Sequence, residues 1–464
     1  MCIFPACDLY LYAPQVFTTS SVIHFLISLL KGASMLDMQR KMTNTFYAVL
    51  SLPATAMGFA LCVQISALSW IMSTKYHLNI EEVGFVWASG PIAGILGQVI
   101  IGLVSDNAWF WGGRRRPFIL IGGILAALML FALPNVDAIG AALGTNNLLF
   151  IGIAVALLLD LSINVSFNPT RSIIADVTPE GDTRTKGYTW MQTISGMFGV
   201  IAYLIGAWLG NYTLIYSGVF LVLVFSVVPT LFITESRTLN QVATNADAGT
   251  NDTIPTGTTD MGQFIRICIA HAFSWLGVQT MFVYMFAYAK QVLPANTDDQ
   301  SIGQVIAISF AVLNTVGFIL PVAALEPLAE RLGRVRTHLL ALVAMAVGYF
   351  GIVFFGKSAV SLYGLMVIVG IGWAAVVSLP FAIMTEKVDK SRMGLFMGIF
   401  NLSVVLPQLA SSLFVGKFIQ AAPDKSLIFV ISGVSLAISA GLWLMVKEVQ
   451  SGGKQGVKQS GSGH

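Results

Sequence analysis

The stretch from Leu148 to Val177 is almost entirely apolar, yet it contains the charged residues Asp160 and Arg171. A run of this length is long enough to cross the roughly 30 Å hydrocarbon core of a bilayer as a helix. An ionised side chain near the centre of a bilayer costs at least about 2.5 kcal/mol. We therefore expect both charges to face a protected and wetted interior of the protein.

Two asparagines lie between these charges at helical intervals. Counted from Asp160, Asn164, Asn168 and Arg171 all fall within one narrow stripe of a helix. This stripe predicts a polar pathway through the membrane.

The composition places the whole chain in the membrane class. Hydrophobic residues make up 56% and charged residues 10% of the 464 residues, against roughly 25% charged residues in soluble domains. The net charge of +3 comes without a dense basic patch, which argues against a nucleic-acid partner. The four cysteines predict neither a disulfide framework nor a metal site. No nucleophile–base set or phosphate-binding glycine loop stands out, so an enzyme is not expected.

About twelve apolar stretches approach the ~20 residues that a transmembrane helix needs, which predicts an all-α integral membrane protein. These stretches lie near 45–74, 83–104, 117–134, 148–174, 189–210, 213–233, 263–293, 301–325, 337–355, 360–384, 393–421 and 425–446.

A polar break at 235–262, rich in Thr, Asn, Asp and Gly, predicts a flexible linker between two six-helix bundles at 45–234 and 263–446. Residues 1–44 are expected to be an N-terminal cytoplasmic segment, and 447–464 a disordered cytoplasmic tail. Whether residues 1–34 belong to the working protein stays open.

The distribution of basic residues predicts the orientation. With both termini in the cytoplasm, most of the 25 Lys and Arg residues fall on the inner side, as the positive-inside rule requires. We recognise no targeting segment, so the expected location is a plasma membrane or a bacterial inner membrane.

Two short turns repeat an acid, a glycine and arginines between apolar stretches. The first comprises Gly102–Asp106 and Gly112–Pro117, and the second is Glu330–Arg336. Such a repeat is typical of two bundles that are related by pseudo-two-fold symmetry and rock around a site at the midplane.

The first turn resembles the signature loop of the major facilitator superfamily, although the spacing between Asp106 and Gly113 is longer than in the usual pattern. The resemblance implies a cytoplasmic gate in which arginines of the turn reach an acid at a neighbouring helix end. The alternative is that these arginines only hold the loops in the cytoplasm. The gate candidates are Asp106, Arg114, Arg115, Asp176, Glu330 and Arg334.

Several further segments, in the same order, resemble the plant sucrose–proton symporters and their animal and bacterial relatives. They are Gly90–Gly94, Leu159–Asp176, Ser378–Ala382 and Asn401–Gln408. The likeness extends from about Phe46 to Lys447. It implies the major facilitator fold and a sugar substrate. The span from His271 to Lys290 lacks the acidic, tryptophan-containing end of the plant proteins and is similar to that of bacterial permeases for maltose and other glucosides.

The resemblance assigns Asp160 to the carboxylate that accepts the proton and Arg171 to its partner. The proton is then the coupling ion, and no other cofactor is expected. Burial disfavours an ionised carboxylate and positive charge favours it, so water and sugar can switch its protonation. A continuous helix separates the two residues by about 16 Å unless Pro169 bends it. As alternatives, Asp160 serves helix packing and Arg171 contacts Asp106 or Asp176.

Sugar recognition requires amides that match hydroxyls and flat apolar faces that cover the C–H side of the rings. Each amide could instead tie two helices together, and each aromatic could face lipid or the core. The candidates are Gln64, Asn164, Asn168, Trp275, Gln279, Asn314, Asn401 and Gln408. His271 fits either a polar core residue or a proton carrier.

Together these features predict proton-coupled uptake of a disaccharide or other glucoside, of the maltose or sucrose class, by alternating access. We expect the protein to act as a monomer in the bilayer. The alternatives are a proton-independent sugar uniporter or exporter, and a sugar sensor that does not transport.

Overall fold

The computed structural model of the chain describes residues 38–96, 109–179, 182–235, 259–389 and 392–448. Asp106 and the segment Gly102–Asp106 lie outside the described residues, as do nearly all of the expected linker and tail.

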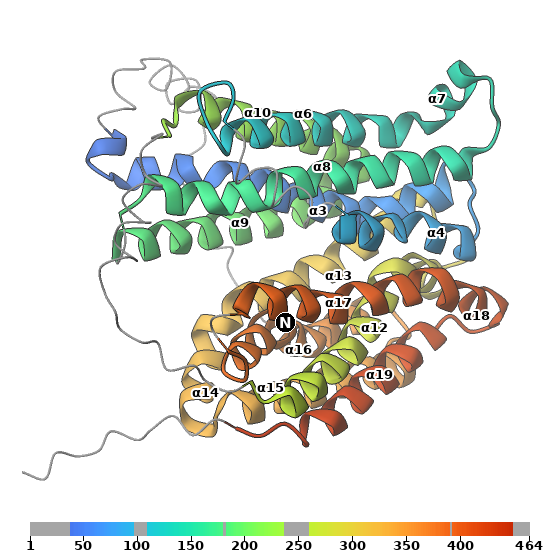
Figure 1. Cartoon of the computed structure of the whole chain (residues 1–464). Helices are drawn as coiled ribbons and strands as arrows, with labels where there is room; N and C mark the ends of the chain where they lie inside the picture. The colour runs from blue at the N-terminus through green and yellow to red at the C-terminus, as the bar shows by residue number, and fades with distance from the viewer. Residues whose placement is uncertain (1–37, 97–108, 180–181, 236–258, 390–391, 449–464) are drawn as a thin grey trace, which may run out of the picture.

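The first half of the chain forms the upper group of helices in Figure 1. Its helices are α3 (Asn44–Thr74), α4 (Ile80–Trp87), α6 (Arg116–Ala132), α7 (Val136–Leu143), α8 (Leu148–Val177), α9 (Asp182–Leu209) and α10 (Asn211–Phe232), with a 3₁₀ turn at Leu133–Asn135.

The second half forms the lower group in Figure 1. Its helices are α12 (Met261–Val292), α13 (Asp299–Leu320), α14 (Glu326–Leu332), α15 (Arg334–Phe355), α16 (Ala359–Thr385), α17 (Met393–Ala410), α18 (Gly416–Ala421) and α19 (Leu427–Trp443). The π-helical segment η2 (Pro321–Leu325) forms the end of the expected span 301–325, and η4 (Ser411–Val415) interrupts the expected span 393–421. Such bulges leave the i to i−4 ladder locally, and an apolar pattern alone does not reveal them.

Ten helices of the described residues are long and apolar enough to cross a membrane, and α19 is a shorter apolar helix. The expected span 83–104 starts within α4 and runs into residues outside the described part. The prediction of an all-α membrane protein is confirmed. Some helices begin earlier than expected, as α9 does at Asp182 rather than near 189, because apolarity marks only the part in the lipid.

Helix α8 carries both Asp160 and Arg171. The side chain of Asn147 caps its start by accepting a hydrogen bond from the backbone N–H of Phe150 (3.1 Å). The helix continues through Pro169 to Val177. Proline is tolerated there because neighbouring groups in a membrane bundle can satisfy the freed carbonyl. Asp160 and Arg171 therefore lie on one uninterrupted helix.

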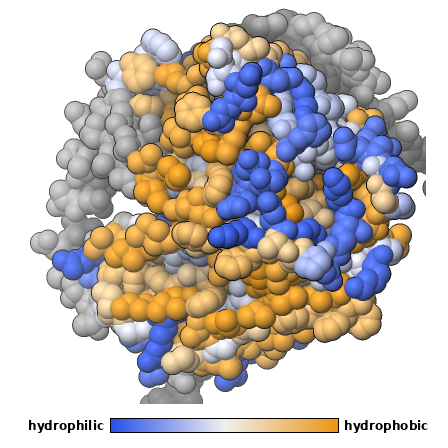
Figure 2. All heavy atoms as spheres, turned by 90° about the vertical axis from the view of Figure 1, so that its right-hand side faces the viewer, coloured by the Kyte–Doolittle hydropathy of each residue, from blue (hydrophilic) through white to orange (hydrophobic). Residues whose placement is uncertain are grey.

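The bundle has two chemically different ends. We call the end that carries Arg114–Arg116 and Arg334–Arg336 the arginine-rich end, and the end that carries Thr74, Lys290 and Asp299 the opposite end. Figure 2 looks onto the opposite end and shows hydrophilic side chains gathered in a band on a largely apolar surface. Polar ends with apolar flanks are what a protein that spans a bilayer requires.

Candidate functional site

A cavity of about 420 Å³ lies between the two halves of the chain. Its volume is within the roughly 300–1,000 Å³ of small-molecule sites, and its lining is mainly apolar with a few polar groups, which is usual for such sites. The lining residues are Leu61, Gln64, Ile65, Trp87, Gly90, Pro91, Gly94, Asp160, Ile163, Asn164, Phe167, Trp275, Gln279, Phe282, Trp373, Val404, Val405 and Gln408.

Asp160 faces this cavity from α8 and is only 5% exposed. Its Oδ2 accepts hydrogen bonds from Gln64 Nε2 (2.9 Å) and Ser89 Oγ (3.1 Å). Gly90 packs beside the carboxylate, and a Cβ at that position would lie at an ordinary contact distance of 3.4 Å from the same oxygen. Neutral donors from two other segments therefore hold the carboxylate. Ser89 was not predicted as part of the site.

Asp160 is the one ionisable side chain among the described residues that line the cavity. Arg171 is exposed, and its guanidinium carbon lies 4.3 Å from the ring centroid of Phe167. The unbroken helix separates Arg171 from Asp160 by about 16 Å. In this conformation the two residues therefore do not form an ion pair.

Aromatic rings form one wall of the cavity. Trp373 of α16 makes edge-to-face contacts with Trp275 (centroids 6.1 Å apart) and with Phe282 (5.3 Å), both on α12. Flat apolar faces of this kind can cover the C–H side of a ring ligand. Trp373 and Trp87 were not predicted, since a single tryptophan in an apolar span carries no mark that separates a cavity position from a lipid-facing one.

Only some of the predicted amides reach the cavity. The structure brings Gln64, Asn164, Gln279 and Gln408 together there, along with Asp160 and Trp275. The predicted residues outside the lining are Asn168, Asn314 and Asn401. Asn314 Nδ2 donates to the carbonyl of Phe310 on its own helix (2.9 Å) and does not line the cavity.

At the arginine-rich end, two of the predicted gate arginines contact the same acid. Asp176 Oδ2 lies 2.9 Å from Arg114 Nη2 and 3.2 Å from Arg115 Nε, which links the start of α6 to the end of α8. Arg334 pairs with Glu386, and both line a separate cleft with Glu330. In each described pair both partners belong to the same half of the chain.

Each half also has a glutamate at the start of one of its helices. Glu235, after α10, accepts hydrogen bonds from the backbone N–H groups of residues 114–116 (2.8–3.2 Å) at the start of α6. Glu448, after α19, accepts from the N–H groups of Arg334 (2.8 Å) and Val335 (3.0 Å) at the start of α15. A carboxylate is favourable at a helix N-terminus.

A glycine makes room for each of these carboxylates. A Cβ at Gly113 would lie 2.6 Å from Glu235, and one at Gly333, where φ is +94°, would lie 2.5 Å from Glu448. The sequence repeat pointed to the glycines and arginines but not to the two glutamates.

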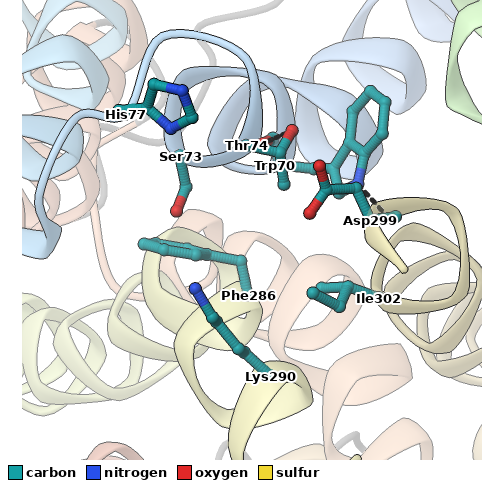
Figure 3. A pocket seen from close by; sticks show the side chains of 8 residues that line it. All are labelled: Trp70, Ser73, Thr74, His77, Phe286, Lys290, Asp299 and Ile302. Atoms are coloured by element: carbon teal, nitrogen blue, oxygen red, sulfur yellow. Dashed lines mark hydrogen bonds between the residues drawn. The ribbon is translucent and has the colours of Figure 1, made fainter. Parts of the chain in front are cut away.

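At the opposite end, hydrogen bonds cross between the halves. Trp70 Nε1 donates to the backbone carbonyl of Asp299 (2.6 Å), beside a small pocket of about 160 Å³ (Figure 3). In that view Phe286 and Lys290 of the second half lie opposite Ser73 of the first half.

A second layer lies between this pocket and the cavity. Trp87 Nε1 donates to Ser69 Oγ (2.7 Å), and Ser69 Oγ donates to the carbonyl of Val283 in the other half (2.8 Å). Nearby, a Cβ at Gly84 would lie 2.4 Å from the carbonyl oxygen of Ser412, so the two backbones touch. The structure therefore closes the cavity toward the opposite end.

Known proteins share both the sequence pattern and the fold. The model of the Major Facilitator Superfamily matches residues 49–412. The chain is 22% identical over 431 residues to sucrose transport protein SUC4 of Arabidopsis thaliana, covering 79% of this chain and 82% of that protein. It is 27% identical over 195 residues to the general alpha-glucoside permease of Schizosaccharomyces pombe, covering 38% of this chain and 35% of that protein.

Solved structures with the same fold include the inward-open xylose transporter XylE from E. coli, with a TM-score of 0.67 and 12% identity, covering 88% of this chain and 97% of that one. The nucleoside transporter NupG has a TM-score of 0.62 and 14% identity, covering 87% and 98%. These homologues and structural neighbours are membrane transporters, not enzymes. The predicted fold is confirmed, and because the family model spans most of the sequence, the chain belongs to the major facilitator superfamily.

Proposed function

We propose that this transporter takes up a disaccharide or another glucoside, of the maltose or sucrose class, together with protons. The observation that carries the proposal is the position of Asp160, a buried carboxylate on the wall of the cavity between the halves. A cavity at this interface can face either side of the membrane as the halves rock.

The lining of the cavity supports a saccharide as the ligand. Four amide side chains can match hydroxyl groups, and the aromatic wall of Trp275, Trp373 and Phe282 can cover the apolar face of a sugar ring. Two of the relatives are named for sucrose and for alpha-glucosides.

The surroundings of Asp160 support a proton as the coupling ion. A lysine or arginine within ion-pair distance would lock the carboxylate in its charged form, whereas Gln64 and Ser89 are neutral. A sugar hydroxyl can therefore compete with these donors, and proton binding and sugar binding affect each other.

The proposed cycle uses the two ends of the bundle. We place the arginine-rich end in the cytoplasm by the positive-inside rule, so the structure is closed toward the outside. Uptake begins when the bonds of Trp70 and Ser69 across the halves open and Asp160 accepts a proton from outside. Sugar then binds, the opposite end closes, and the cavity opens to the cytoplasm. Without sugar, the carrier must not release protons to the inside, or the gradient dissipates.

Uptake of labelled maltose and sucrose into proteoliposomes, with and without an imposed pH gradient, tests the proposal. We expect the gradient to drive accumulation above equilibrium. Entry at a rate indifferent to the gradient would indicate a uniporter, and sugar binding without entry would indicate a sensor.

A further inference from the structure

His271 lies on α12 one turn before Trp275 and outside the cavity lining, and it is 3% exposed. Its Nε2 accepts a hydrogen bond from Trp275 Nε1 (2.9 Å), with the two rings perpendicular. Because Nε2 is the acceptor, the neutral imidazole carries its proton on Nδ1. The indole N–H of Trp275 is thus already bonded, so this residue presents its ring to the cavity rather than a donor.

A second helix fixes the imidazole. The ring of Phe400 on α17 stacks on His271 with centroids 4.9 Å apart and an angle of 8° between the planes. The acceptor is therefore held in place before any ligand arrives. Preorganised groups lose little conformational freedom when they act on a neighbour.

The orientation of Trp275 determines the shape of the aromatic wall. Its ring packs edge-to-face on Trp373, which packs edge-to-face on Phe282, and all three rings line the cavity. An indole released from His271 could rotate and turn its N–H toward the ligand, which would change both the width of the cavity and its hydrogen-bonding pattern.

We propose that His271 is a positioning residue that holds Trp275 in place and thereby sets which saccharides the cavity accepts. This inference rests on the proposed function. It differs from a role in proton transfer, because His271 does not line the cavity.

The chain offers a matched control. His338 on α15 is also fully buried, and its ring packs against Trp443 with centroids 4.4 Å apart. Neither of these two residues lines the cavity. His338→Ala therefore measures the general cost of removing a buried imidazole beside a tryptophan in the same half of the protein.

The first test is uptake kinetics for sucrose, maltose and smaller glucosides in His271→Ala, Trp275→Phe and the double variant. We expect His271→Ala to raise KM about tenfold for the preferred sugar, with kcat within about twofold, and to narrow the difference between sugars. In the Trp275→Phe background the same change should have little further effect. His271→Gln should restore part of the affinity, because its amide oxygen can accept the indole N–H. An equal rise of KM in both backgrounds, or the same rise in His338→Ala, would overturn the inference.

A second readout needs no sugar. In protein labelled with ¹⁵N at the indoles of its 9 tryptophans, the N–H resonance of Trp275 is identified by its loss in Trp275→Phe. We expect His271→Ala to shift this resonance and His338→Ala to leave it in place. A resonance that does not move refutes the hydrogen bond and the inference. If it moves while transport continues with an unchanged KM, the inference alone fails. If the wild type neither binds nor transports saccharides, the proposed function fails and takes the inference with it.

Discussion

The two ends of this bundle are held together in different ways. At the opposite end, the bonds of Trp70, Ser69 and Glu81 cross from one half of the chain to the other. At the arginine-rich end, the described carboxylate contacts, such as those of Asp176 and Glu235, join helices of the same half. In the proposed cycle, the hydrogen bonds across the opposite end therefore break whenever that end opens, whereas the carboxylate contacts can move with each half as a rigid unit.

The strengths of these contacts fit this division. A hydrogen bond between membrane helices contributes about 0.6 kcal/mol on average, so a few of them can open and close at modest cost. Removing one partner of a largely buried ion pair costs more, because the other charge stays behind in a poorly hydrated place, so such a pair suits a permanent structural role.

The largest effect is expected from Asp176→Asn at the arginine-rich end. This change removes the charge that Arg114 and Arg115 share at a site where Asp176 is only 19% exposed. We expect a loss of about 2–3 kcal/mol in stability, measured as a lower Tm in detergent. Asp137→Asn is the control at the opposite end, where the pair with Lys75 is much more exposed and should contribute under about 0.5 kcal/mol. Equal losses of stability in the two variants would show that the ion pairs at the two ends do not differ in strength.

The next effect concerns the two helix caps. Glu235→Gln and Glu448→Gln each keep an accepting oxygen but lose the charge at a helix N-terminus. We expect each to lower the stability by about 1 kcal/mol, because the two halves use the same arrangement. Thermal unfolding of both variants checks this. A loss in one variant only would show that the two ends of the repeat are not equivalent.

Ser69→Ala probes the opposite end directly, since it removes the bond to the carbonyl of Val283. We expect the end to open more often, so that a Ser73→Cys reporter in the small pocket reacts about threefold faster with a thiol reagent. Thr74→Ala is the control, because Thr74 lines the same pocket but its hydroxyl bonds to Trp70 of its own helix. If both changes accelerate labelling equally, the bond across the halves does not hold this end closed.

The smallest effect is a pH dependence at the opposite end. The side-chain amide of Gln291, which donates to Asp424 (2.7 Å), holds the pKa of this carboxyl below its usual range. A depressed carboxyl pKa adds stability above the unfolded pKa, near 4, and this contribution is lost as the pH falls further. Because Asp424 is largely exposed, we expect Asp424→Asn to lower the Tm by only about 1 °C at neutral pH. The difference should shrink as the pH falls below the unfolded pKa and vanish below the folded pKa, and a difference that grows with acidity would contradict the assignment.

Sequence patterns predicted the helices well because the bilayer imposes them. In the bilayer core, the backbone N–H and C=O groups of an apolar stretch must form hydrogen bonds within that stretch, which requires a helix. The position of the helix can therefore be predicted before its packing is known. The cost of a charge in lipid likewise pointed to a protected interior position for Asp160, which the structure places on the cavity wall. The π-helical segments and the early start of α9 were not visible, since neither changes the apolar pattern.

Which residues line the cavity could be determined only from the folded structure. Asn164 and Asn314 are the same residue type in similar apolar spans, and only the packing places one at the cavity and the other against Phe310. Ser89 and Trp373 are isolated residues whose neighbours in sequence give no hint of their neighbours in space. The capping role of Glu235 could have been suspected only by matching it to Glu448 through the repeat.

Accumulation of labelled maltose or sucrose in proteoliposomes by Asp160→Asn tests the central claim most directly. Asparagine keeps the shape of the side chain and hydrogen-bonding capacity toward Gln64 and Ser89, but it cannot bind and release a proton. We predict that the variant loses accumulation driven by the pH gradient while it still exchanges sugar across the membrane. Accumulation at the wild-type level would contradict the proposal that this carboxylate couples protons to transport.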